Sequence, residues 1–219
     1  MAIFEELSPL RWPKKGDNPF KVKDGDRMSP AWISLKWLAT MQPNDTIYAE
    51  AFKRSGDKLV DALCQQEIRS PSDIYFMPIT YLYRHSLEIQ LKEIIKFSLR
   101  LGLIEETKSV SKVIKKHGLH ELWNYARKGI EAFWPRESLP DDAKNDVDHA
   151  ERIILEFHKI DMTGQSLRYP QDTKGNNSLK DTPEAVELTQ IKDVFKAIYN
   201  FLGGCSSGLS DAIDNMPDY

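Results

Sequence analysis

The sequence of 219 residues is poor in cysteine, and it lacks both an excess of basic residues and a long apolar run. Its two cysteines, Cys64 and Cys205, lie far apart and match no redox or metal-ligand spacing, so we expect reduced thiols in a cytoplasmic protein. The formal net charge of −3 argues against a surface that binds nucleic acid or anionic membranes over its whole extent. Because no uncharged apolar stretch approaches the length of a membrane span, we expect no membrane partner.

Several catalytic signatures are also missing. The chain contains no P-loop, dinucleotide-binding glycine motif, HExxH, paired CxxC or nucleophile elbow, which removes several large classes of enzyme. His117 and His120 are close in sequence, but Gly118 lies between them and weakens the helical spacing that two metal ligands would need. We therefore expect neither a metal site nor a cofactor.

What is present is the periodicity of helices, which predicts an all-α, up-and-down bundle of five or more helices. Residues 1–43 are expected to form an irregular N-terminal arm ending in a short helix that begins near Ser29 and Pro30 and packs on the bundle. Trp32 and Trp37 in this segment either cover the core or form an exposed binding patch. Residues 44–219 are expected to form the bundle itself.

Capping and stop signals give the expected limits of the bundle helices. Two segments between the expected helices lack apolar periodicity: a lysine-rich linker at residues 108–117, and a long loop or small hairpin at residues 161–181. The expected helices run from Asn44 to about Ile68, from Asp73 to Leu101 with a kink or late start at Pro78, from Leu119 to Phe133, from a capping box at Ser138 and Asp141 through Phe157, and from Thr182 to Phe201, where Gly203 and Gly204 follow.

The helix expected around residues 80–100 carries a polar stripe beside its apolar face. Arg84, Glu88 and Lys92 recur at intervals of four residues and so share one side. The stripe is either a solvated surface held by ordinary ion pairs or a charged wall that faces a groove.

A ligand site forms in this region if the loop containing Arg168 folds back onto the long helix. Arg84, His85 and Arg168 would then supply donors to an anion, while acidic residues orient them. The alternative is that Arg84 or Arg168 ties the loop down through a buried carboxylate pair, and that His117 caps the backbone. The candidate ligand-binding residues are Arg84, His85, Glu88, His117, Arg168 and Asp172, with Asp161 as a further orienting carboxylate.

Arg152 and His158 form a second candidate pair, which suits metal-independent RNA cleavage. Histidine would move the proton of the ribose 2′-hydroxyl, and arginine would stabilise the phosphate oxygens. Six residues along a helix correspond to about 600° of rotation, which leaves the two side chains about 120° apart. The pair therefore lies on different flanks of one straight helix.

Three segments together resemble the HEPN superfamily of helical domains. They are YLYRHSLEIQLKEII at residues 81–95, HGLHELW at 117–123 and FHKIDMTGQSLRYPQD at 157–172, which ends in Arg168, Tyr169, Pro170, Gln171 and Asp172. The resemblance covers about residues 45–202. It implies a helical bundle that often dimerises and that occurs in toxin-antitoxin, abortive-infection and other anti-phage systems, frequently as an endoribonuclease.

In catalytic members of this superfamily an arginine and a histidine assemble across a dimer interface. The resemblance places these roles on Arg152 and His158, although Ile153 stands where such members usually carry a polar residue. The leading hypothesis is a homodimeric HEPN-like protein that acts on or beside RNA or a nucleotide, with an antitoxin as a protein partner. The alternative is a non-catalytic helical module that binds another protein through the Trp32 to Trp37 segment and the loop at 161–181.

Overall fold

The computed structural model describes residues 33–40, 44–65, 72–171, 174–179 and 182–217. The chain divides into two compact units, Met1–Pro43 and Asn44–Tyr219. In the first unit, helix α1 (Leu35–Thr40) spans part of the expected short helix, whereas Trp32 and the preceding arm lie outside the described residues. The second unit contains the candidate site.

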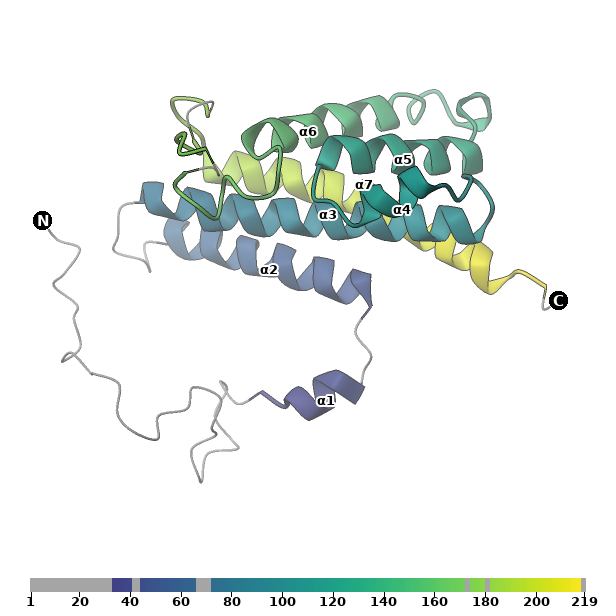
Figure 1. Ribbon diagram of the computed structural model, residues 1–219, viewed down its shortest axis with the longest axis horizontal. Coiled ribbons are helices and arrows are strands. Elements are labelled where there is room, and N and C mark those ends of the chain that lie inside the picture. The colour runs from purple at the N-terminus through teal and green to yellow at the C-terminus, as the bar shows by residue number, and fades with distance from the viewer. Residues whose placement is uncertain (1–32, 41–43, 66–71, 172–173, 180–181, 218–219) are drawn as a thin grey trace, which may run out of the picture. The chain divides into compact units, whose positions relative to one another are not determined.

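The regular elements in the described part of the second unit are all helices, which confirms the all-α prediction and the helical bundle (Figure 1). The loop predicted at 161–181 contains an isolated bridge between Gln171 and Asn177, and the described residues form no longer strand. The helices are α2 (Asp45–Cys64), α3 (Phe76–Arg100), α4 (Lys108–Ile114), α5 (Leu119–Phe133), α6 (Asp146–Ile160) and α7 (Leu188–Asp214), with 3-10 turns η1 (Ser72–Tyr75) and η2 (Arg136–Ser138).

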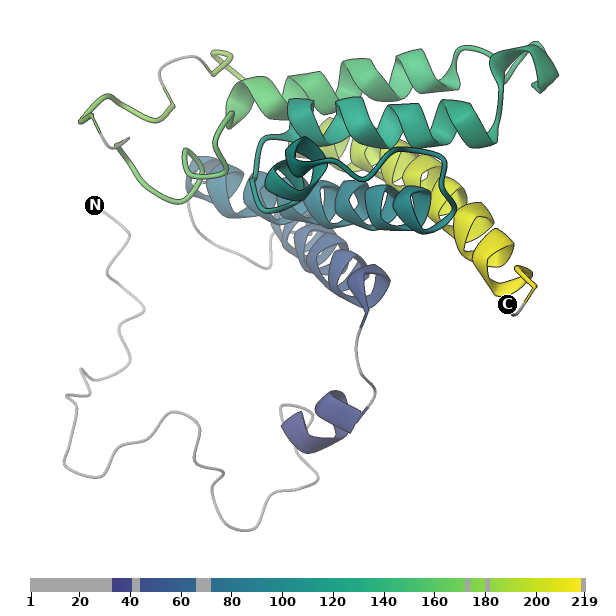
Figure 2. The ribbon, with the colours of Figure 1, turned by 45° about the vertical axis from the view of Figure 1, so that its right-hand side comes forward.

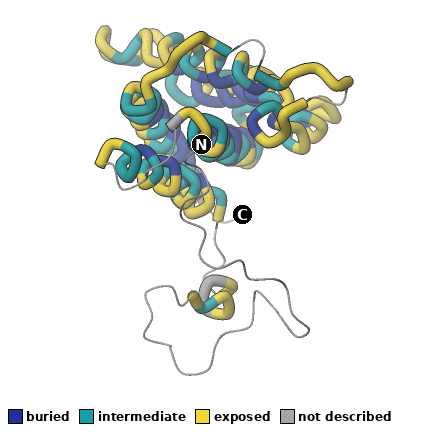
Figure 3. Tube along the Cα trace, turned by 90° about the vertical axis from the view of Figure 1, so that its left-hand side faces the viewer, coloured by how far each residue is buried: buried dark blue, intermediate teal, exposed yellow. Residues whose placement is uncertain are grey.

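Helix α3 lies at the centre of this unit. It packs against α2, α5 and α7, while α6 packs against α5 and α7, as the turned view also shows (Figure 2). Apolar side chains that include Tyr83, Leu87 and Leu91 are buried along α3, and the burial is concentrated where the helices face one another (Figure 3). Because α3 is covered on several sides, even its polar stripe is withdrawn from water: Arg84 and Glu88 are 1% and 3% exposed. The solvated-surface interpretation is therefore wrong for these two residues.

Local signals explain several helix ends. The Asn44 side chain accepts a hydrogen bond from the Ile47 backbone N–H at 3.1 Å, as an N-cap should. α3 begins at Phe76, so Pro78 lies in its first turn, where a missing N–H is tolerated. Gly102 follows the end of α3 with φ of +67°, the left-handed conformation that favours glycine after a helix.

Three expectations about helix limits are wrong. Ser138 bonds back to the Pro135 carbonyl instead of capping α6, which begins eight residues later at Asp146. α7 begins at Leu188 and continues through Gly203, because the apolar pattern extends to Leu209 and buries it in the core. The lysine-rich linker contains α4, which Thr107 caps by accepting from the Val110 N–H.

Gly129 marks a close approach of α5 to α3. A Cβ built on this residue would lie 2.0 Å from Ser98 Oγ and 2.6 Å from Ser98 Cβ. We expect Gly129→Ala to lower the free energy of unfolding by about 1 to 3 kcal/mol, although alanine is the better helix former. Gly204→Ala is the matched control in α7, since its Cβ would meet nothing within 4 Å, and it should raise stability by up to about 1 kcal/mol. Urea denaturation followed by circular dichroism measures both, and a stabilised Gly129→Ala would contradict the close contact.

Candidate functional site

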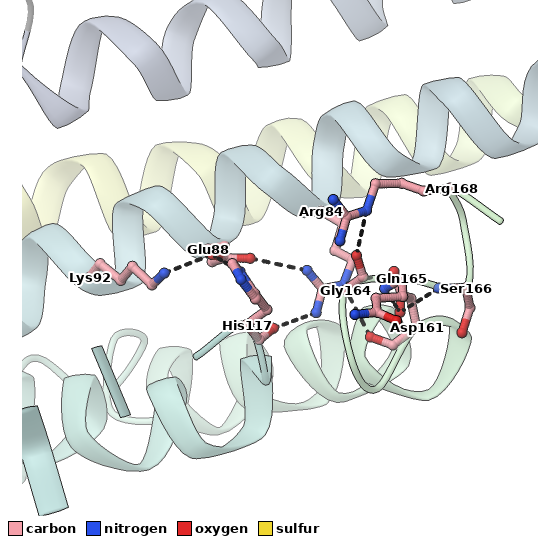
Figure 4. A network of polar contacts seen from close by, with 9 residues as sticks. All are labelled: Arg84, Glu88, Lys92, His117, Asp161, Gly164, Gln165, Ser166 and Arg168. Atoms are coloured by element: carbon pink, nitrogen blue, oxygen red, sulfur yellow. Dashed lines mark hydrogen bonds and ion pairs between the residues drawn. The ribbon is translucent and has the colours of Figure 1, made fainter. Parts of the chain in front are cut away.

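The buried Arg84 guanidinium joins three segments that are distant in sequence (Figure 4). Its Nε donates to the Asp161 carbonyl at 3.1 Å, and Nη1 donates to Glu88 Oε2 at 3.2 Å. Its Nη2 donates to the backbone carbonyl of His117, in the loop before α5. One side chain of α3 therefore holds both the turn that precedes α5 and the end of α6.

Glu88 lies one helical turn further along α3 and receives three donors. Besides Arg84, Lys92 Nζ donates to its Oε1 at 2.7 Å, and His117 Nδ1 lies 2.8 Å from the same oxygen. Burial of Glu88 favours the neutral acid, but the hydrogen bonds from Lys92 and His117 outweigh this effect and hold the pKa of Glu88 below its ordinary value. Glu88 is therefore a carboxylate at neutral pH, and His117 carries a proton on Nδ1.

Asp161 organises the loop that follows α6. Its Oδ1 accepts hydrogen bonds from the backbone N–H groups of Gln165 and Ser166, at 2.9 and 3.1 Å. Its Oδ2 is buried without a hydrogen bond and lies 3.6 Å from Arg84 Nε, which is an ion pair rather than a hydrogen bond. The carboxylate thus folds the loop back onto α3, as the sequence hypothesis required.

Gly164 allows this loop to come close to the network. Its φ is +77°, and a Cβ on it would lie 2.9 Å from His117 Cβ and 3.3 Å from Arg84 Nη1. The Gly164 carbonyl accepts a hydrogen bond from Arg168 Nε at 2.8 Å. The Arg168 side chain is exposed at the surface, with its guanidinium carbon 5.8 Å from the centres of the Tyr81 and Tyr169 rings.

These contacts assign different roles to the two arginines. Arg84 uses all three of its nitrogens within the protein and is almost inaccessible to solvent, so it acts as the tie between loop and helix. Arg168 contributes an exposed charge beside Tyr81. Asp172, the remaining acidic residue of the candidate ligand set, lies outside the described residues.

Two further histidines lie side by side next to this network. The rings of His120, in the first turn of α5, and His158, in the last turn of α6, have centroids 5.7 Å apart. Burial lowers the pKa of His158, His120 and Arg84 lower it further, and Glu121 and Asp161 oppose the shift. His158 is therefore neutral at neutral pH, and its Nδ1 is buried without a hydrogen bond.

His85 lies away from the ionic contacts of its own helix. Its ring stacks on Tyr81 with centroids 5.7 Å apart and meets the edge of Phe52 at 4.4 Å. Burial lowers the pKa of His85, so the ring is neutral and serves an aromatic cluster between α2 and α3.

Arg152 and His158 lie on different flanks of α6, as their spacing predicts. Arg152 is exposed and lines an apolar pocket of about 800 Å³ on the side of α6 that faces α7, together with Lys159 and Ile191. His158 instead faces His120 on α5. Within one chain the described structure therefore pairs His158 with His120 and leaves Arg152 elsewhere.

The sequence did not predict the contact between His120 and His158. It indicates His120 only as a candidate metal ligand, and the one signal for a further role was the place of His120 in the HGLHELW segment. Among the residues that the structure describes, no group of three or more His, Cys, Asp or Glu side chains is placed to hold a metal ion. None of the described helices is long and apolar enough to span a bilayer.

Comparison with known proteins adds no identification. No family model matches the chain, and searches of curated proteins and of solved structures find no match.

Proposed function

We propose that this chain is a HEPN-like helical protein that acts on RNA or a nucleotide, with the surface around His120 and His158 as its site of metal-independent RNA cleavage. The observation that carries the proposal is the contact between these two imidazoles, with ring centroids 5.7 Å apart, beside the Arg84 and Glu88 network. A pair of histidines supplies both a proton acceptor and a proton donor without a metal ion.

The environments of the two rings suggest which would perform each role. His158 is neutral and would accept the proton of the ribose 2′-hydroxyl, whose oxygen then attacks the adjacent phosphorus. His120 is exposed and would donate a proton to the departing 5′-oxygen. This leaves a 2′,3′-cyclic phosphate and a free 5′-hydroxyl, so the protons balance without a further reactant.

The superfamily resemblance supplies the remaining part of this proposal. Arg152 lies on the other flank of α6, so it would reach the phosphate only from a second copy of the chain in a homodimer. Such a protein would act in a defence or toxin-antitoxin system, where a cognate antitoxin would restrain it.

A second function is supported by a different observation. The loop after α6 exposes two large apolar side chains, Met162 at 60% and Tyr169 at 56%, while Arg84 and Asp161 beneath it serve only to hold the loop. These features suit a non-catalytic module that presents the loop to another protein.

Incubation of the purified protein with labelled RNA in EDTA separates the two functions. We expect cleavage by the wild type and cleavage that is about 10² to 10⁴ times slower by His158→Ala, because the imidazole that accepts the proton is then absent. His149→Ala is the control, since His149 is an exposed histidine of the same helix. Absence of cleavage over varied RNAs, together with a protein that co-purifies and is lost in Tyr169→Ala, would favour the interaction module.

A further inference from the structure

A polar pocket of about 450 Å³ lies between α2, α3 and α7, away from the histidine pair. Carboxylates of Glu93 and Asp211 line it, together with hydroxyl groups that include Ser206 and Thr46. Among the described residues that line this pocket there is no lysine, arginine or histidine. Its lining therefore has negative charge and hydrogen-bond acceptors in excess.

Glu93 is the most deeply placed of these groups, at 4% exposure. Thr46 Oγ1 donates to its Oε1 at 2.7 Å, and Ser206 Oγ donates to its Oε2 at 2.6 Å. No cationic side chain of the described residues forms an ion pair with it. Burial of a carboxylate without a cation is costly, and two hydroxyl donors offset that cost only in part.

Gln90 adds an independent observation one turn earlier on α3. Its side chain is 3% exposed and lines the same pocket. Its Nε2 donates to the Tyr199 carbonyl at 3.2 Å, but its Oε1 is buried without a hydrogen-bond partner. Buried acceptors are normally satisfied, so this oxygen has an unused capacity for one donor.

We propose that the pocket binds a small primary diamine, such as putrescine. One ammonium group has three N–H donors and would satisfy Glu93 together with the free Gln90 oxygen. The second ammonium would pair with Asp211, which is exposed, lines the pocket and forms no ion pair with a described residue. Phe97 and Tyr199 would pack against the methylene chain between them. This site does not depend on the proposed RNA cleavage.

Isothermal titration calorimetry of the full chain with putrescine tests the proposal. 1,4-Butanediol is the neutral control ligand, since it has the same length without the charges. Glu93→Gln removes the buried charge at nearly constant shape, and Asp211→Asn removes the exposed one. Asp214→Asn is the matched control, because Asp214 is also exposed on α7, removes the same charge and does not line the pocket.

We expect one putrescine per chain and no binding of butanediol. Loss of a charged hydrogen bond should weaken binding about ten- to hundredfold in Asp211→Asn and at least as much in Glu93→Gln, with no change in Asp214→Asn. Absence of binding to the wild type would overturn the proposal, as would equal weakening in the two aspartate variants. If Glu93→Gln unfolds, the comparison of Asp211→Asn with Asp214→Asn still decides the outcome.

Discussion

Replacement of Arg84 by methionine should lower the free energy of unfolding by about 3 to 5 kcal/mol, among the largest effects of any single substitution in this chain. The change removes the cation that lies 3.6 Å from Asp161 Oδ2 and leaves the carbonyls of Asp161 and His117 without the donors they now have. Methionine fills much of the volume but offers no N–H group. Urea denaturation followed by circular dichroism gives the difference directly.

Two further variants distinguish loss of the hydrogen-bond network from simple loss of a positive charge. Arg100→Met removes an exposed charge from the last turn of the same helix and should change stability by less than about 0.5 kcal/mol. Arg84→Lys should recover little, because one ammonium cannot span acceptors on α3, on the loop before α5 and at the end of α6. A loss below about 1 kcal/mol in Arg84→Met would show that the network does not hold the loop.

The sequence predicted the helices best where a local signal coincides with the tertiary structure. Asn44 caps α2 and Gly102 follows α3 because both signals act on the adjacent backbone. The capping box at Ser138 failed because the serine found a nearer partner in the Pro135 carbonyl. The stop at Gly203 failed because packing of the last turns of α7 against the core outweighs the low helix propensity of glycine.

The candidate site shows the same division between local and long-range information. The four-residue spacing places Arg84, Glu88 and Lys92 on one side of α3, and the sequence hypothesis of a returning loop placed Arg168 beside them. Whether that side faced water or protein depended on how the turn before α5 and the end of α6 pack over it. Periodicity within one helix contains no information about such packing.

Prediction of the contact between His120 and His158 required even more long-range information, because this contact depends on the register between two helices. His120 lies near the start of α5 and His158 near the end of α6, so the contact arises only when the helices run in opposite directions against each other. The sequence hypothesis instead paired His158 with Arg152, which lies six residues earlier on the same helix. The angle of about 120° around the helix axis between Arg152 and His158 already indicated that these two side chains face different neighbours.

The roles proposed for the two histidines predict different pH dependences of RNA cleavage in their alanine variants. The wild type should give a bell-shaped profile of kcat/KM, because one group must be deprotonated and the other protonated. His158 acts as the base, so the rate should rise with pH as His158 loses its proton, and burial places the midpoint of this rise below the ordinary value of 6.5.

Removal of either ring should reduce kcat/KM by about 10² to 10⁴. His158→Ala should also lose the rise of the rate on the acid side, whereas His120→Ala and His149→Ala should keep it. The two slow variants therefore differ in their pH dependence, which mere loss of folding would not produce. If His158→Ala keeps the wild-type rise, the contact between the rings packs the ends of α5 and α6 together and His158 accepts no proton, because an enzyme cannot lose its general base and keep the pH dependence of that base.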